Sequence, residues 1–279
     1  MSDSSFPPGL YIVATPIGNL SDLSPRAADV LKHADRVLAE DKRVTAKLLR
    51  HIGADTPMTA YHDHSDDSLR ERVLADLGHK RIALVSDAGT PLISDPGYKL
   101  VRAARAAGLA VHTIPGPSAA IAALTLAGLP TDRFLFVGFL PAKAKARSEA
   151  IAELAAIRAS LIFYESGPRL SASLAALADG LGNRDAAVVR EISKLHEETV
   201  TGRLSDLAER YEEGGPKGEI VVVVGPPGAA AEATEDDLDA AIDEALTRLS
   251  PSRAAAEVAE KLGIKKKRAY ARALERSGH

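Results

Sequence analysis

The sequence contains no cysteine. This absence excludes disulfides, a thiolate nucleophile and any metal site with cysteine ligands, and it fits a cytoplasmic setting. Long apolar runs are also missing, so no segment is expected to span a bilayer. The polar beginning, MSDSSFPPG, lacks the basic and apolar regions of a secretory signal. We therefore expect a cytoplasmic protein without membrane association.

Two familiar glycine-rich signatures, the Walker sequence and GxGxxG, are absent. The usual glycine spacing therefore signals neither a nucleoside triphosphate nor a dinucleotide. The net charge of −3 gives no overall attraction to nucleic acid, but basic residues gather near the end of the chain. These are Lys261, Lys265, Lys266, Lys267, Arg268, Arg272 and Arg276. A local basic surface matters more here than the total charge.

Alternating strand and helix patterns predict an α/β protein. Short apolar runs predict strands over Arg36 to Ala39 and Glu219 to Val224. Ser24 and Pro25 predict the N-cap and the first turn of a helix over Arg26 to Ala34.

The stretch 81–116 is central to the chain. It begins with an apolar run, Ile82 to Val85, which is followed by a loop rich in Asp, Gly and Pro. An alanine-rich amphipathic segment comes next, and a second apolar run ends at Pro115 and Gly116. In a parallel α/β unit, the loop after a strand opens the ligand-binding crevice. We therefore expect a ligand to bind at residues 86–97.

The pattern restarts after Gly116, which predicts two α/β lobes, 1–116 and 117–228. Residues 143–147 (KAKAR) and 193–202 are expected to be loops, and residues 226–232 a linker. The remaining segment, 233–279, has alanine and valine at helical spacing, a turn at Gly263 and a basic helix containing Tyr270. This spacing predicts a small helix-turn-helix module, with Thr234 capping its first helix.

Several polar groups allow more than one interpretation. His62, Asp63 and His64 suggest metal ligands, with Asp66 and Asp67 nearby, but no further spacing completes a site, so a solvated loop is favoured and no metal is predicted. Carboxylates that follow apolar runs can act as bases, cap helices or form ion pairs. The group from Lys194 to Glu198 is more typical of a solvated face. The basic last helix fits a solvated surface or nucleic-acid contact, and its spacing favours contact.

Five segments, in order across nearly the whole chain, resemble the tetrapyrrole methylase superfamily: ATPIGNLSDLSPRA, AEDKR, SDAGTPLISDPG, PGPSAAIAAL and FYESGPRL. The resemblance is closest to the ribosomal branch, which methylates the 2′-oxygen of a cytidine in small-subunit rRNA, and SDAGTPLISDPG is its specific block. Where the porphyrin-precursor branch has a GGDP-like loop and a GxGPGD-like opening, this chain has AGTP and ATPIGN. These departures argue against a tetrapyrrole substrate.

The resemblance implies two α/β lobes with S-adenosyl-L-methionine in the cleft between them, a homodimer, and a small helical tail. It implies an enzyme that methylates a cytidine ribose in 16S rRNA, in the decoding centre of the small ribosomal subunit. The implied cofactor contacts are Pro16, Ile17, Ala88, Gly89, Thr90, Ile93, Ser118, Ala119, Tyr164 and Glu165.

A ribose 2′-hydroxyl must lose its proton during methyl transfer, so a general base is expected. The resemblance makes Glu40 the first candidate for this base, with Asp41 and Glu191 as alternates. The expected contacts to RNA phosphates are Lys143, Lys145, Arg147, Arg169, Lys194, Lys265, Lys266, Lys267, Arg268 and Arg272.

Two other functions stay open at this point. One is a methylase of the same fold that acts on a tetrapyrrole or another small acceptor, although a small substrate would leave the basic tail with nothing to bind. The other is a non-catalytic regulator, which would bind duplex DNA with salt-dependent affinity and transfer no methyl group.

Overall fold

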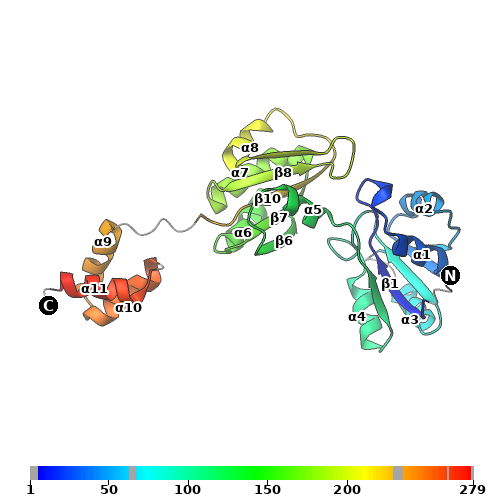
Figure 1. Cartoon of the computed structure of the whole chain (residues 1–279), viewed down its shortest axis with the longest axis horizontal. Coiled ribbons are helices and arrows are strands. Elements are labelled where there is room, and N and C mark those ends of the chain that lie inside the picture. Colours follow the sequence, from blue (N-terminus) through cyan, green and yellow to red (C-terminus); the bar gives the residue numbers. More distant parts are fainter. Residues whose placement is uncertain (1–5, 63–66, 229–234, 263, 278–279) are drawn as a thin grey trace. The chain divides into compact units, whose positions relative to one another are not determined.

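The computed structural model describes residues 6–62, 67–228, 235–262 and 264–277. One compact unit contains Ala159–Gly225 and the described residues up to Leu154, and the second contains Pro226–His279 with Ala155–Arg158 (Figure 1). Among the helices of the described residues, none has both the length and the apolar character needed to cross a bilayer.

The first unit begins with a five-stranded parallel sheet of order β3-β2-β4-β1-β5. Its strands are β1 (Gly9–Val13), β2 (Arg36–Ala39), β3 (Met58–Ala60), β4 (Arg81–Val85) and β5 (Val111–Ile114). Helices cover both faces, which explains why most side chains of these strands are apolar. The helices are α1 (Pro25–His33), α2 (Lys42–His51), α3 (Asp67–Leu77) and α4 (Tyr98–Ala106).

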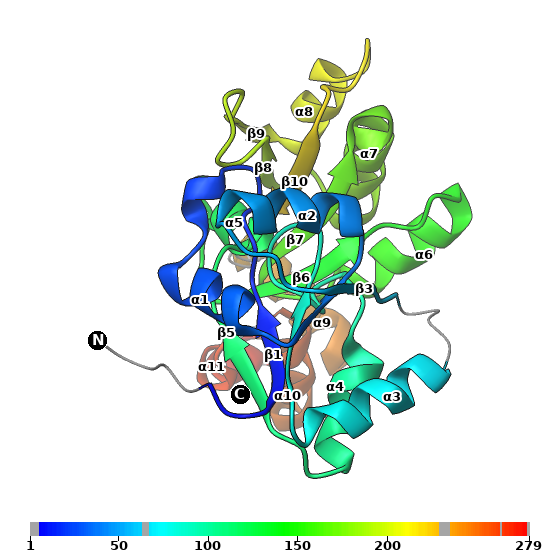
Figure 2. The ribbon, with the colours of Figure 1, turned by 90° about the vertical axis from the view of Figure 1, so that its right-hand side faces the viewer.

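The pleat of β4 divides its side chains between two cores. Ala83 and Val85 pack with residues of α1 and α2, whereas Ile82 and Leu84 pack with residues of α3 and α4. Figure 2 shows α1 and α4 on opposite sides of strands β1 and β5. This arrangement sends the loops that follow β1, β2 and β4 to one edge of the sheet.

The predicted start of α1 is confirmed in detail. A short 3-10 helix, η1 (Leu20–Asp22), precedes it, and Pro25 takes the first helical turn. The Ser24 hydroxyl oxygen accepts a hydrogen bond from the Ala27 amide at 3.1 Å. Such a cap satisfies one of the amides that a helix start leaves unpaired.

The second sheet of this unit has the order β6-β7-β10-β8-β9. Its strands are β6 (Phe134–Phe139), β7 (Ser160–Ser166), β8 (Asp185–Arg190), β9 (Glu198–Arg203) and β10 (Glu219–Val224). Only β6 and β7 run parallel; the other described pairs are antiparallel. Helix α5 (Ala119–Leu126) packs on one face through Ala120, Ala123 and Leu124. The remaining helices are α6 (Ala144–Leu154), η2 (Gly167–Arg169), α7 (Leu170–Leu181) and α8 (Leu204–Arg210).

Two predicted loops are wrong in part, because a helix covers most of the first and a strand the second half of the other. Residues 144–147 form the first turn of α6, because alanine, lysine and arginine are strong helix formers and neither glycine nor proline interrupts them. Residues 198–202 belong to β9, which pairs with β8 over its whole length. Thr199, Val200 and Thr201 are β-branched and suit a strand, although the polar neighbours hid that signal.

The described residues of the second unit form three helices, α9 (Glu235–Leu246), α10 (Pro251–Leu262) and α11 (Lys266–Arg276). Its core is mostly alanine with a few larger side chains, among them Ile242 and Val258. Small side chains let the helix backbones approach closely. The predicted helical module is confirmed, while the capping residue Thr234 and the turn residue Gly263 lie outside the described residues.

Candidate active site

A cavity of about 380 Å³ lies between the two sheets of the first unit. Apolar side chains form much of its wall: Ile17, Ile93, Phe139, Ile192 and Val221. Polar groups line it as well, among them Ser94, Asp95, Ser118, Glu165 and Glu219. This mixture and size suit a small amphiphilic ligand.

The loop after β4 forms the wall on the side of the first sheet. Gly89 has a φ of 79°, and its backbone exchanges two hydrogen bonds with Thr15, of 2.8 and 3.1 Å. The Thr90 hydroxyl donates to the Pro117 carbonyl at 3.0 Å. Leu92 and Ser94 also take positive φ, 75° and 66°, which is unusual for residues other than glycine. The loop is therefore held in a strained shape of the kind found at binding sites.

The second sheet contributes the start of α5 and the end of β7. Ser118 is the N-cap residue of α5, but its side chain makes no capping hydrogen bond. The first-turn amides of this helix are thus suited to an anionic group of a ligand. Burial raises the pKa of the Tyr164 hydroxyl. The Tyr164 ring contacts the rings of Phe136 and Phe139 edge-on.

Glu165 lines the same cavity, but partners in its own lobe hold its carboxylate. The Ser173 hydroxyl donates to it at 2.5 Å and the Ser166 amide at 2.8 Å. Arg169 lies 3.4 Å from the same carboxylate and donates to the Leu140 carbonyl at 2.5 Å. Glu165 therefore shapes the wall, and Arg169, which we expected at the RNA, is engaged inside this lobe.

Asp95 is a cavity residue that the sequence reasoning did not single out. Burial raises its pKa to about 6; a hydrogen bond with Ser86 lowers it, and the nearby carboxylates of Glu40 and Asp87 raise it further. A carboxyl that titrates near neutral pH in a ligand cavity is a candidate for proton transfer. The available signal was its place in SDAGTPLISDPG, the most specific block of the chain.

None of the three predicted bases lines this cavity. Glu40 follows β2, and one of its carboxylate oxygens lies 3.5 Å from the donating Asp87 amide. Asp41 caps α2, and its hydrogen bonds from the Arg43 side chain lower its pKa to about 2. Asp41 is thus a weak base in a structural role.

Glu191 is also held by a cation. Its backbone has a φ of 50°, and its carboxylate lies 2.8 Å from Lys194. The hydrogen bond from Lys194, with a second from the Glu219 amide, lowers the pKa of Glu191. The Lys194 ammonium also pairs with the Glu219 carboxylate at 3.0 Å, so two carboxylates compensate this lysine.

A second cavity, of about 300 Å³, adjoins the first and shares Ile17, Ala88 and Glu219 with it. Pro16, predicted to touch the cofactor, lines this second cavity and not the first. Thr45 is buried beside it, and its hydroxyl has no hydrogen-bond partner among the residues that the structure describes. All the other predicted cofactor residues line the first cavity.

The cations predicted to bind RNA are divided between the two units of the chain. Lys143 and Lys145 are exposed at the start of α6, with Lys145 3.9 Å from Glu149. Arg268 and Arg272 form ion pairs within the second unit. The described part of the chain contains no cluster of three or more side chains that could hold a metal ion. Residues 63–66, which belong to the predicted loop of histidine and aspartate, lie outside the described residues.

Comparison with known proteins finds two family models that match this chain. Residues 9–208 match the family model of the Tetrapyrrole (Corrin/Porphyrin) Methylases. The chain therefore belongs to the tetrapyrrole methylase family. Residues 232–277, which contain the three helices of the second unit, match the model of the RsmI C-terminal HTH domain.

A relative of known name narrows this assignment, and two solved structures have a similar fold. The chain is 56% identical to Ribosomal RNA small subunit methyltransferase I of Erythrobacter litoralis (strain HTCC2594), over 96% of this chain and 95% of the relative. The predicted resemblance to the ribosomal branch is thus confirmed. The fold is similar to that of the methyltransferase CobJ, with a TM-score of 0.60 at 17% identity, covering 80% of this chain and 95% of that one.

The second structure is Uroporphyrin-III C-methyl transferase from Thermus thermophilus complexed with S-adenyl homocysteine. Its TM-score is 0.53 at 22% identity, with 78% of this chain and 97% of that chain covered. At such low identity the two structures speak for the fold alone. They confirm the predicted two-lobed α/β class.

Proposed function

We propose that this protein transfers a methyl group from S-adenosyl-L-methionine to the ribose 2′-oxygen of a cytidine in 16S rRNA, in the decoding centre of the small ribosomal subunit. The observation that supports this most directly is the first cavity, which brings together predicted cofactor residues from both lobes. The rRNA substrate is supported by the relative from Erythrobacter litoralis, whose name is that of a ribosomal RNA small subunit methyltransferase.

The residues of the first cavity fit the proposed cofactor. Ile17, Ile93 and Ile192 offer an apolar surface for an adenine ring. The uncapped start of α5 suits a carboxylate. When bound, S-adenosyl-L-methionine supplies a methyl group activated by its sulfonium. The Thermus thermophilus methyltransferase of similar fold, which was solved in complex with S-adenyl homocysteine, agrees with this choice.

The protein must align the acceptor oxygen with the methyl group and remove the hydroxyl proton. Asp95 is the best placed base, because it lines the cavity and its pKa of about 6 leaves it mostly ionised at neutral pH. Glu40 is the second candidate, since it lies close enough to Asp95 for its charge to raise the pKa of Asp95. Asp41 and Glu191 are poorer bases, because cations lower their pKa values.

The adjoining cavity is a suitable entrance for the acceptor nucleotide. Lys47 and Lys194 line it, and the unpartnered Thr45 hydroxyl can exchange a hydrogen bond with a ribose or base. Because the two cavities share wall residues, a nucleotide in the second would lie beside a cofactor in the first.

A homodimer is part of the proposal. Strand β6 is an edge strand of its sheet and exposes Phe134, Leu135 and Phe139, and α5 exposes Ile121 and Leu126. Exposed apolar groups of this kind are typical of protein interfaces. Light scattering during gel filtration should give twice the chain mass of 29.3 kDa. The mass of a single chain would contradict the dimer.

The function is tested by transfer of tritiated methyl from S-adenosyl-L-methionine to purified small ribosomal subunits that lack their ribose methylations. Total tRNA, a tetrapyrrole precursor and duplex DNA are run in parallel. Label in alkali-resistant dinucleotides of the subunit RNA is expected, because a 2′-O-methyl group blocks alkaline cleavage at that position. Label in the small acceptor only, or no label in any acceptor, would contradict the proposal.

A further inference from the structure

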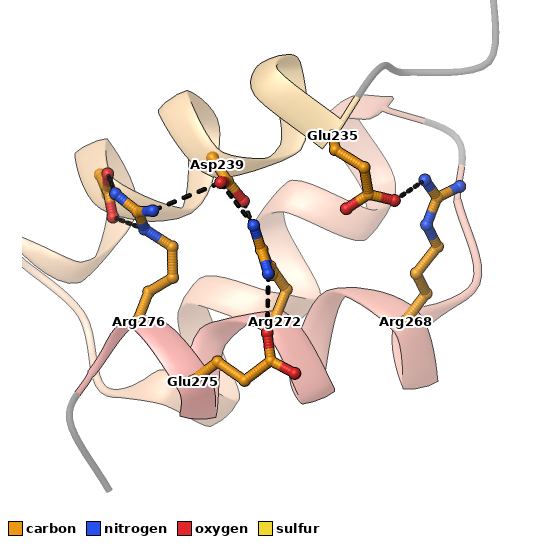
Figure 3. A network of polar contacts seen from close by, with 7 residues as sticks. Glu235, Asp239, Arg268, Arg272, Glu275 and Arg276 are labelled. Atoms are coloured by element: carbon orange, nitrogen blue, oxygen red, sulfur yellow. Dashed lines mark hydrogen bonds and ion pairs between the residues drawn. The ribbon is translucent and has the colours of Figure 1, made fainter.

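Helices α9 and α11 are joined by a ladder of ion pairs, shown in Figure 3. The Arg268 guanidinium lies 2.7 Å from the Glu235 carboxylate, Arg272 donates to both carboxylate oxygens of Asp239 at 2.5 and 2.6 Å, and Arg276 pairs with Asp243. Both series advance four residues at a time, a spacing that keeps side chains on one side of a helix. We call these six residues the arginine ladder.

The ladder changes which cations of this unit are available to RNA. Arg272 makes a bidentate contact with Asp239 and a further contact with Glu275 at 2.8 Å. Hydrogen bonds from Arg272 lower the pKa of Asp239, so this carboxylate stays charged over the working pH range. A phosphate would have to displace a charged, bidentate partner from Arg272. Two of the arginines predicted to hold RNA therefore serve to join two helices.

The opposite side of α11 carries exposed lysines and an exposed tyrosine. Lys265, Lys266 and Lys267 are exposed at its beginning, and Tyr270 is 41% exposed one turn later. With 3.6 residues per turn, Lys266, Lys267 and Tyr270 lie across the helix from the ladder. No ion pair within the described residues involves these three lysines. We call Lys266, Lys267 and Tyr270 the lysine–tyrosine face.

We propose that the lysine–tyrosine face binds single-stranded RNA, with the two ammonium groups on phosphates and the Tyr270 ring stacked on an unpaired base. Uncompensated lysines supply the electrostatic attraction that phosphate binding needs. An exposed aromatic ring provides a stacking surface that matches unpaired bases, which a continuous duplex does not offer. This inference rests on the proposed RNA substrate and identifies the residues of the helical unit that contact it.

The full chain is tested by fluorescence anisotropy with a labelled RNA hairpin that has an unpaired loop, and with duplex RNA and duplex DNA of equal length. The double variant Lys266→Gln, Lys267→Gln should bind the hairpin about tenfold more weakly at 0.1 M salt. Its slope of log affinity against log salt should fall by about 1.4, since each phosphate contact on a single strand contributes about 0.7. Tyr270→Ala should lose about tenfold in affinity, whereas Tyr270→Phe keeps the stacking ring and the affinity.

The matched control is the double variant Arg248→Gln, Lys261→Gln. It removes the same charge from the same unit, but from side chains that pair with Glu257 and Glu244. Its affinity should stay within about twofold of that of the unaltered chain, since no phosphate contact is lost. An equal loss in both double variants, or no loss in the lysine variant, would overturn the lysine–tyrosine face. Tighter, lysine-dependent binding of either duplex would overturn the single-stranded partner. An unaltered chain that binds none of the three probes would overturn this face and the proposed RNA substrate together.

Discussion

At the scale of single residues, the cavity depends on backbone shapes and charges that few substitutions can preserve. Gly89 combines a positive φ with close neighbours: a Cβ atom there would lie 3.3 Å from Ile17 Cγ2. Asp95 combines partial burial with two neighbouring carboxylates. The first residue limits the space for a ligand, and the second is a carboxyl group with a pKa of about 6.

Gly89→Arg should reduce the affinity for S-adenosylhomocysteine by at least about 100-fold, because its side chain would fill the cavity and displace apolar contacts. Isothermal titration calorimetry measures this affinity directly. Gly53→Arg is the matched control: Gly53 has a φ of 67°, but a Cβ atom there would meet nothing within 4 Å. An affinity of Gly89→Arg equal to that of the control would contradict the cavity assignment.

The turnover of the unaltered enzyme should rise about tenfold between pH 5 and pH 7, because a base with a pKa of about 6 must be ionised to accept a proton. Asp95→Asn should lose this rise together with about 100-fold or more in kcat. Asp41→Asn should keep the profile, since Asp41 titrates near pH 2. Calorimetry on both variants separates proton transfer from cofactor binding. An unchanged pH profile in Asp95→Asn would assign the base elsewhere, with Glu40 next to be replaced.

At the scale of elements, charged side chains on different sides of helix α11 have different roles. The arginine ladder ties α11 to α9, and the alanines of α11 pack in the core of the unit. The side that bears Lys266 and Lys267 is left for a partner. A count of basic residues along α11 therefore overstates its available positive charge.

Asp239→Asn should increase amide hydrogen exchange in α9 and α11, because it removes the central rung, which contacts Arg272 and Arg276. The effect should shrink in 1 M salt, where the Debye length falls to about 3 Å. It should also shrink as the pH falls. The pKa of Asp239 is lowered from 3.8 in the folded chain, so its stabilising effect is complete above that value and disappears as the pH falls through the folded pKa.

Asp236→Asn is the control for this experiment, because it removes a carboxylate from the same helix that no ion pair of the described residues involves. Mass spectrometry of α9 and α11 peptides reports the exchange. Equal exchange in the two variants at low salt and neutral pH would show that the ladder does not hold these helices together.

At the scale of the whole molecule, the two proposed functions, cofactor binding and RNA binding by the lysine–tyrosine face, belong to separate units. Every residue that lines the first cavity belongs to the unit with the two sheets. The arginine ladder and the lysine–tyrosine face belong to the other unit. Cofactor binding and this part of RNA binding should therefore be separable.

A chain shortened to residues 1–228 should keep its affinity for S-adenosylhomocysteine within about twofold, since it retains the complete cavity. Its affinity for the RNA hairpin should fall by at least about tenfold, because the phosphate contacts of the lysine–tyrosine face are lost. Calorimetry and anisotropy measure the two affinities. Loss of cofactor binding in a shortened chain that is still folded would show that the helical unit contributes to the cavity.

Much of the fold was predictable because its signals are local. Apolar runs and helix caps located strands such as β2 and β10 at their observed bounds and began α1 at the residues expected. The same local reasoning missed β9, where the β-branched residues stand among polar ones, and placed a loop at the start of α6. Of the ten cofactor contacts that the resemblance implies, nine line the first cavity, and Pro16 is the exception.

The sequence by itself determined the α/β class, the helical tail and the loops that meet at the cavity, since each depends on residues close together along the chain. Only the tertiary structure decided the environment of individual charges. It placed Pro16 in the adjoining cavity, raised the pKa of Asp95 through burial and its carboxylate neighbours, and paired Arg268 and Arg272 with α9. The electrostatic role of a side chain depends on partners distant in the sequence, and folding alone brings those partners together.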